Sequence, residues 1–274
     1  MTTIRSPQSA SLVCSFDVSA DALADRPDDT ARSAATILDR LDRLGLAATW
    51  AIAEVSRAAV LPRVLNARSA HEIAVLGQRS WCGPEVCRGH FERELAKRLL
   101  RARPNAQQAT TLVLRDRASA RHLDLLVKHG MNAVRCDCLG SALAERTGPR
   151  TMTVQPRGWL GRSQPSLALQ GRCVRWGLWH FLVGAPFTGR RPRRCLRLIE
   201  QAVQLGAMAH LLVDVPRLRA AGAPGARALA VLLERAAALR DAGALAVERF
   251  SDVTARLARP VQPGSARSIL RRAA

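Results

Sequence analysis

Apolar runs with the composition of buried strands alternate with segments of helical periodicity along most of the chain, and this alternation restricts the fold more than any other feature. The runs that we expect to form strands are residues 11–17, 46–53, 71–76, 110–115, 131–135, 207–215 and 244–249. Strands that alternate with helices pair in parallel through right-handed crossovers. The sequence therefore predicts an α/β fold, in the form of a (β/α)-barrel of about seven parallel strands.

The segments between the runs carry the period of amphipathic helices. Residues 29–45 are typical, because apolar side chains recur three and four positions apart and Gly45 can end the helix. We expect one barrel domain over residues 1–258 and a basic, loosely held tail over residues 259–274. Residues 139–171, which are rich in Gly, Pro and Arg, fit no regular element.

Length and cysteine usage exclude several protein classes. No apolar run in the 274 residues approaches the roughly 18 that a membrane span requires. The N-terminal residues lack the features of a signal peptide, so we expect a cytoplasmic protein. The seven cysteines form neither a disulfide framework nor the C-x2-C pairs of a structural zinc site.

The formal net charge of +20 suggests a polyanion partner. The basic residues are spread along the chain, however, and there is no tyrosine and little phenylalanine for base stacking. No nucleic-acid-binding motif appears either. Nucleic acid is therefore an unlikely partner, although a basic polyanion-binding protein on a barrel scaffold stays an alternative.

Polar side chains follow several of the expected strands. In a (β/α)-barrel the chemistry takes place where the strands end at their C-terminal edge. Asp17, Arg115 and Asp214 end three strands, and residues 76–80 follow a fourth. We assign Trp179 and His180 to a further strand end and interpret His71 and His210 as structural histidines. Asp17, Arg115 and Asp214 are therefore the candidate catalytic residues.

The order of several motifs resembles the polysaccharide deacetylase (NodB-homology) family. "SLVCSFDVSAD" followed by "ILDRLDRLGLAATWAIAE" resembles the family's opening, and "AHEIAVLG" resembles the run that leads into its metal-binding loop. "LVLRDRASARHLDLLVKHGM" resembles the arginine motif, and "HLLVDVPRL" the late histidine segment. The likeness runs from about Ser11 to Leu257 and is poor over residues 139–195.

The resemblance implies hydrolysis of an amide, typically an N-acetyl group on a sugar, with one zinc or similar divalent cation. The cation would lower the pKa of its bound water and polarise the carbonyl. The family's base corresponds to Asp17, and the arginine that orients the base corresponds to Arg115. The metal-binding Asp corresponds to Val18 or Ser19, the two metal-binding His to Leu76 and Ser80, and the late acid His to Asp214.

Ser19, Leu76 and Ser80 make the metal site degenerate, because leucine has no donor atom and a serine hydroxyl is a poor zinc ligand. We therefore expect no retained metal. Gln78, Trp81 and His180 would form the rim of the pocket, with a carbohydrate or amino sugar as a possible ligand. The leading interpretation is a catalytically degenerate carbohydrate-binding or regulatory barrel. An active hydrolase of carbon–nitrogen bonds with a metal-poor site is the alternative.

Overall fold

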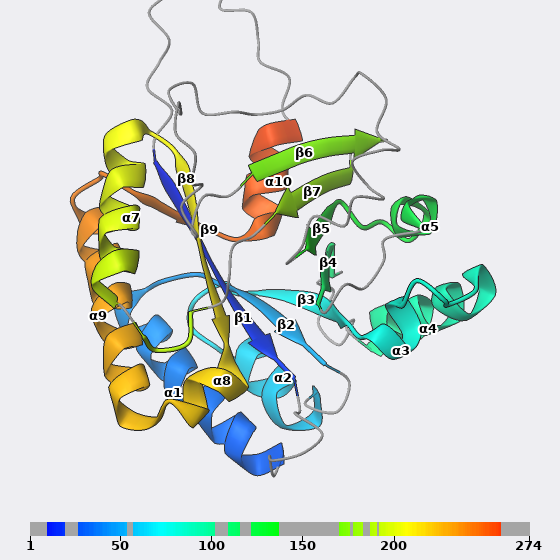
Figure 1. Cartoon of the computed structure of the whole chain (residues 1–274), viewed down its shortest axis with the longest axis horizontal. Helices are drawn as coiled ribbons and strands as arrows, with labels where there is room; N and C mark the ends of the chain where they lie inside the picture. The colour runs from blue at the N-terminus through cyan, green and yellow to red at the C-terminus, as the bar shows by residue number, and fades with distance from the viewer. Residues whose placement is uncertain are drawn as a thin grey trace, which may run out of the picture.

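A computed structural model of the protein describes residues 10–19, 27–53, 57–101, 109–115, 122–136, 170–175, 178–182, 187–190 and 192–258. Its centre is a sheet in which seven strands run parallel in the order β7-β5-β4-β3-β2-β1-β8 (Figure 1). These strands are β1 (Ser11–Val18), β2 (Thr49–Ile52), β3 (Glu72–Gly77), β4 (Thr111–Leu114), β5 (Ala133–Cys136), β7 (Leu178–Leu182) and β8 (Met208–Asp214). The seven strands curl into a half-barrel, which confirms the predicted fold class.

Two further strands join the sheet. β6 (Gln170–Arg175) pairs antiparallel with β7 and forms its outer edge. β9 (Ala246–Glu248) pairs with the first residues of β1, on the edge that β2 occupies further along the strand. The sequence did not predict β6, which extends into the segment that fitted no element. Trp179, expected at a strand end, is instead the second residue of β7 and is buried.

Helices follow most strands, and several of them cover the convex side of the sheet, whereas α10 (Phe250–Ala258) packs on the concave side. They are α1 (Pro27–Leu44), α2 (Arg57–Leu65), α3 (Arg79–Cys82), α4 (Arg88–Arg101), α5 (Leu123–Lys128), α7 (Pro192–Leu205), α8 (Val215–Ala220), α9 (Gly222–Asp241) and α10 (Phe250–Ala258). α7 packs against α9, and α8 contacts both α1 and α9, so these four helices form one layer beside β1 and β8 (Figure 1). Of the short helices, α3 and α8 were not predicted.

Alternation along β1 divides its side chains between the two faces of the sheet. Leu12, Cys14, Phe16 and Val18 pack in the large hydrophobic cluster under the helices. Val13 points to the concave face, where it packs with residues of β5, β7, β8 and α10. Successive side chains of a strand point to opposite faces, so Ser15 and Asp17 follow Val13 onto the concave face. The polar site thus lies on the inside of the half-barrel.

A buried carboxylate joins α10 to the N-terminal ends of the central strands. Glu72 accepts hydrogen bonds from the hydroxyls of Thr49 (2.8 Å) and Thr111 (2.6 Å) and from the backbone N–H of Ser251 (3.0 Å). Burial raises the pKa of Glu72, and these three donors oppose that shift. The neighbouring His71 accepts a hydrogen bond from the Ala48 N–H at Nδ1 (3.1 Å). The contact of His71 suits the structural role that the sequence predicted for it, and the contacts of Glu72 give that carboxylate a structural role too.

Two predicted segments lie outside the described residues. These are the basic tail, residues 259–274, and most of the unassigned segment, residues 139–169. In the part of the chain that the structure describes, no helix has the length and apolar composition needed to cross a membrane.

Candidate functional site

The carboxyl ends of β1 and β8 place two aspartates next to each other. Asp17 and Asp214 are register partners in the parallel β1–β8 pair. Both residues are buried. These two candidates lie together because parallel strands end at the same edge of the sheet.

Arg115 connects the two aspartates. It follows the last residue of β4, and its Nε lies 3.8 Å from Asp17 Oδ2. Its Nη1 donates a 2.8 Å hydrogen bond to Ser19 Oγ, and its Nη2 forms an ion pair with Asp214 Oδ2. The expected pair between Asp17 and Arg115 is thus present, and the arginine side chain is only 15% exposed.

A second arginine, which the sequence did not single out, holds Asp17 more closely. Arg135 on β5 is completely buried and donates from both terminal nitrogens to the two oxygens of Asp17, with Nη1 2.7 Å from Oδ1. A charged side chain within a buried strand needs a partner of opposite charge. The position of Arg135 inside the apolar run 131–135 therefore indicated a buried ion pair, but nothing in the sequence identified the partner.

Ser15 and His210 extend this network toward the middle of the barrel. Arg135 Nη1 donates to Ser15 Oγ (2.9 Å), and Ser15 Oγ lies 2.7 Å from His210 Nε2. Since the hydroxyl already accepts from the guanidinium, its own proton is available to His210, whose Nε2 then accepts. His210 is buried as predicted, and burial, aided by the charge of Arg135, holds its pKa well below the usual value. Among the described residues its Nδ1 has no hydrogen-bond partner.

Asp214 also begins helix α8. As its N-cap, the Oδ1 of Asp214 accepts a hydrogen bond from the backbone N–H of Arg217 (3.1 Å). The Arg217 guanidinium, with a 58% exposed side chain, lies 3.5 Å from Oδ2 of the same carboxylate. The sequence "DVPR" is typical of a helix start, with an aspartate before a proline in the first turn. Asp214 therefore has a structural role in addition to its place in the site.

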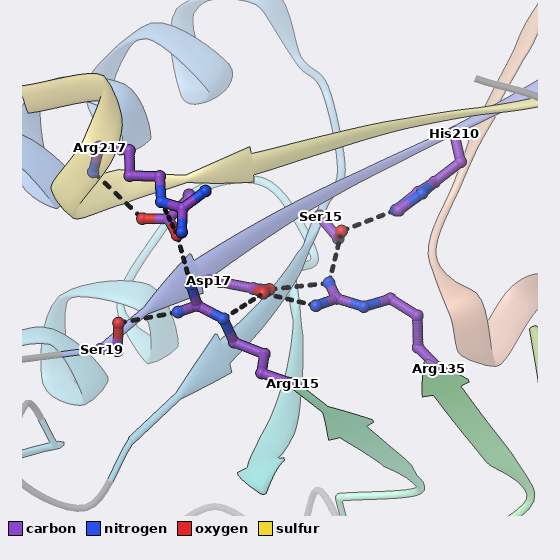
Figure 2. A network of polar contacts seen from close by, with 8 residues as sticks. Ser15, Asp17, Ser19, Arg115, Arg135, His210 and Arg217 are labelled. Atoms are coloured by element: carbon purple, nitrogen blue, oxygen red, sulfur yellow. Dashed lines mark hydrogen bonds and ion pairs between the residues drawn. The ribbon is translucent and has the colours of Figure 1, made fainter. Parts of the chain in front are cut away.

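Together these residues form the network that Figure 2 shows, which we call the arginine–aspartate cluster: Ser15, Asp17, Ser19, Arg115, Arg135, His210, Asp214 and Arg217. Three guanidinium groups face two carboxylates, so the cluster carries an excess of one positive charge. A divalent cation binds through the same carboxylate lone pairs that the guanidinium groups use here.

The remaining predicted positions are spread over different environments. Val18 and Leu76 are buried in apolar clusters, and Ser80 is exposed on α3. Ser19 lies in the cluster, bound by Arg115. No group of three or more His, Cys, Asp or Glu side chains placed to hold a metal ion occurs within the described ranges. The side chains of Val18 and Leu76 carry no donor atom for a cation.

The expected pocket rim is corrected in part. Trp81 does not lie at a rim: it is 1% exposed and packs with Phe91 (ring centroids 5.7 Å apart) under the guanidinium of Arg98. The Trp81 indole belongs to the core because α3 packs against α4. Gln78 is the half-buried residue before α3 at the carboxyl end of β3. His180 belongs to β7, and its side chain lies outside the described part.

Comparison with known proteins shows similarity in structure alone. No family model matches the sequence, and no curated protein matches it. A putative polysaccharide deacetylase from Mycobacterium smegmatis has a similar structure, with a TM-score of 0.59 and 14% identity over 93% of this chain and 92% of that one. A probable polysaccharide deacetylase from Pseudomonas aeruginosa is similar at a TM-score of 0.55 and 10% identity, over 89% of both chains.

The same fold appears in proteins with other properties. A mutant, with restored enzymatic activity, of a pseudoenzyme of the CE4 family from Bacillus anthracis has a TM-score of 0.51 and 12% identity over 91% of this chain and 69% of that one. A 4-alpha-glucanotransferase from Thermococcus litoralis has a TM-score of 0.58 and 12% identity over 90% of this chain and 40% of that one. The shared feature is the polysaccharide deacetylase-like fold, and a fold alone does not define an activity.

Proposed function

We propose that the protein is a catalytically degenerate barrel of the polysaccharide deacetylase type, which binds carbohydrate without hydrolysing it. The observation that carries the proposal is the bidentate contact of Arg135 with Asp17, the position of the family's catalytic base. A general base must offer a lone pair to the proton that it removes. Asp17 offers its oxygens to two guanidinium groups instead.

The metal chemistry of the fold is the second part of the proposal. A divalent cation would have to compete with the fixed charges of Arg115 and Arg135 next to the same carboxylates. Placing a divalent cation beside these guanidinium groups would bring positive charges close together in a buried site, where charge repulsion is poorly screened. We infer that the protein uses the two arginines in place of a metal to neutralise Asp17 and Asp214.

A polar ligand would meet the exposed groups of the cluster. Arg217 is largely exposed and Arg115 partly so, and the excess positive charge favours ligands with hydroxyl, carboxylate or sulfate groups. With Trp81 buried, recognition would depend on hydrogen bonds from arginine rather than on stacking at that position. We therefore expect weak binding of carbohydrate oligomers, with a preference for acidic sugars.

Two measurements on the same protein test this function. Incubation with N-acetylglucosamine oligomers should release no acetate above the level of a buffer control, with or without added zinc or cobalt. NMR titration with neutral and acidic sugar oligomers should shift signals of the Arg217 region, and Arg217→Ala should weaken binding while Arg93→Ala, an exposed arginine on α4, should not. Acetate release that Asp17→Asn abolishes would overturn the proposal in favour of an active hydrolase.

A further inference from the structure

Helices α1, α8 and α9 enclose a groove of about 430 Å³ on the convex side of the barrel, away from the concave arginine–aspartate cluster. This volume lies within the range of about 300–1,000 Å³ that is usual for small-molecule sites. The three helices form the corner of the helix layer beside β8 in Figure 1. Nothing in the proposed carbohydrate function uses this groove.

The wall that α9 contributes to the groove is apolar and regular, whereas α1 contributes mostly polar side chains. α9 contributes Ala226, Leu229, Ala230 and Leu233, which share one face of the helix by their spacing of three and four. α1 contributes Ser33, Thr36, Ile37 and Arg40 with the same spacing. The lining of α1 continues to Arg43, so the groove follows about 15 Å of that helix at the usual rise per residue. α8 closes it with Val215 and Leu218.

The edge of the groove is basic. Among the described residues, the lining includes four arginines, Arg40, Arg43, Arg219 and Arg227, and no acidic residue. Arg40 and Arg219 lie 3.5 Å from Glu234 and Asp29, so two carboxylates accompany four guanidinium groups. Arg43 donates from Nε to the backbone carbonyl of Asp39 (3.2 Å) and is exposed at its tip, as is Arg227. The edge therefore has an excess of positive charge.

We propose that this groove binds an amphiphilic anion with a single hydrocarbon chain and a carboxylate head, that is, a fatty acid. The chain would lie along the apolar face of α9, opposite Ile37 of α1, where each buried methylene group contributes to binding through the hydrophobic effect. The carboxylate would reach Arg43 or Arg227, whose guanidinium groups suit bidentate binding of a carboxylate.

Size and charge favour this ligand over other occupants. A protein helix has a diameter of about 10–12 Å with its side chains, too wide for a groove of this volume. A sugar would leave its hydroxyl groups against the leucine and alanine walls without hydrogen-bond partners, which is costly. The positive head group of a cationic amphiphile would be repelled by the excess positive charge at the edge of the groove. The fatty acid alone matches both the apolar wall of α9 and the basic edge.

Calorimetric titration with three probes tests the proposal: dodecanoate, dodecyltrimethylammonium, which has the same chain and a cationic head, and acetate, which lacks the chain. All are used below their micelle concentrations. Dodecanoate should bind at one site, at least about tenfold more tightly than either of the other two. Equal binding of dodecanoate and dodecyltrimethylammonium would overturn the assignment, since it would make the arginines irrelevant.

Variants locate the site. The pair Arg43→Glu and Arg227→Glu, both at exposed positions, should weaken dodecanoate binding about tenfold or more, whereas Arg93→Glu on α4 should not change it. Ala226→Trp, also at an exposed position, should fill the groove and abolish binding. Binding that survives both changes in folded variants, or that appears only with vesicles of anionic lipid, would show that the groove is not a fatty acid site. Arg217→Ala, which should weaken carbohydrate binding and does not line the groove, should leave dodecanoate binding intact, which separates this proposal from the carbohydrate function.

Discussion

Asp17 and Arg135 form a bidentate ion pair across the concave face, although β2, β3 and β4 separate their strands in the sheet. Neighbouring strands lie about 4.8 Å apart, so side chains four strands apart can meet only if the sheet is strongly curled. The pair thus couples the electrostatics of the site to the curvature of the half-barrel, and its charges are fully buried.

Removing one partner of this pair should be strongly destabilising. Arg135→Met leaves Asp17 with Arg115 alone in a buried position, and we expect a loss of about 3–5 kcal/mol in the free energy of unfolding. Urea unfolding followed by circular dichroism measures the loss. Arg93→Met, an exposed change on α4, is the control and should change stability by less than about 0.5 kcal/mol.

The double variant Asp17→Asn with Arg135→Met measures the direct interaction between these two side chains. Because the second substitution removes the charge that the first leaves uncompensated, the two losses should not add, and the coupling should reach about 1–3 kcal/mol. Additive losses would contradict a direct interaction between the two side chains.

Stability should fall in mild acid because of His210. Burial lowers the pKa of this histidine in the folded protein, so below the usual value of 6.5 the unfolded chain takes up a proton that the folded chain does not. The contribution of His210 to the free energy of unfolding is therefore fully present above pH 6.5. It is lost as the pH falls toward the pKa of His210 in the folded protein, by about 1.4 kcal/mol per pH unit.

His210→Gln removes the titration and keeps an acceptor for Ser15. Urea unfolding at a series of pH values from 7.5 to 5 should show a shallower loss in this variant than in the wild type, by about 1.4 kcal/mol per unit below pH 6.5. His71, whose pKa burial also lowers, contributes equally to both proteins. Parallel stability curves would mean that His210 is not buried in its neutral form.

A side chain at Gly189 should destabilise the protein. The φ of Gly189 is +79°, and a Cβ there would lie 2.6 Å from the Cα of Gly225 on α9. Gly243 has a similar φ of +70° but open space around a Cβ, so Gly243→Ala reports backbone strain alone. We expect Gly189→Ala to cost about 1–3 kcal/mol more than Gly243→Ala in thermal or urea unfolding. Equal costs would show that the loop before α7 does not pack against α9 as described.

The fold was largely predictable because its pattern is local. Strand and helix periodicity in residues 11–53 reflects which side chains each element buries, and parallel pairing follows from the alternation. β6 was not predictable in this way, since it pairs antiparallel at an edge and its sequence "QGRCVR" has no apolar periodicity. The short helix α8 depends on its cap by Asp214 more than on its composition.

The site was predictable only where a charged residue stands at the carboxyl end of a strand. Asp17, Arg115 and Asp214 end their strands, so the sequence placed them together. The contact of Arg135 depends on the curl of the whole sheet, which no local pattern encodes. Trp81 was misplaced for a related reason, because its burial depends on how α3 packs on α4.

The most direct test of the central claim, that arginines occupy the place of the metal, is the zinc content of the purified, tag-free protein. After equilibration with micromolar zinc and removal of excess metal, elemental analysis should find less than about a tenth of an equivalent, because the carboxylates of Asp17 and Asp214 are already neutralised and imidazole ligands are absent from Leu76 and Ser80. The Asp17→Asn variant should give the same value. One equivalent of zinc in the wild type, lost in Asp17→Asn, would contradict the account.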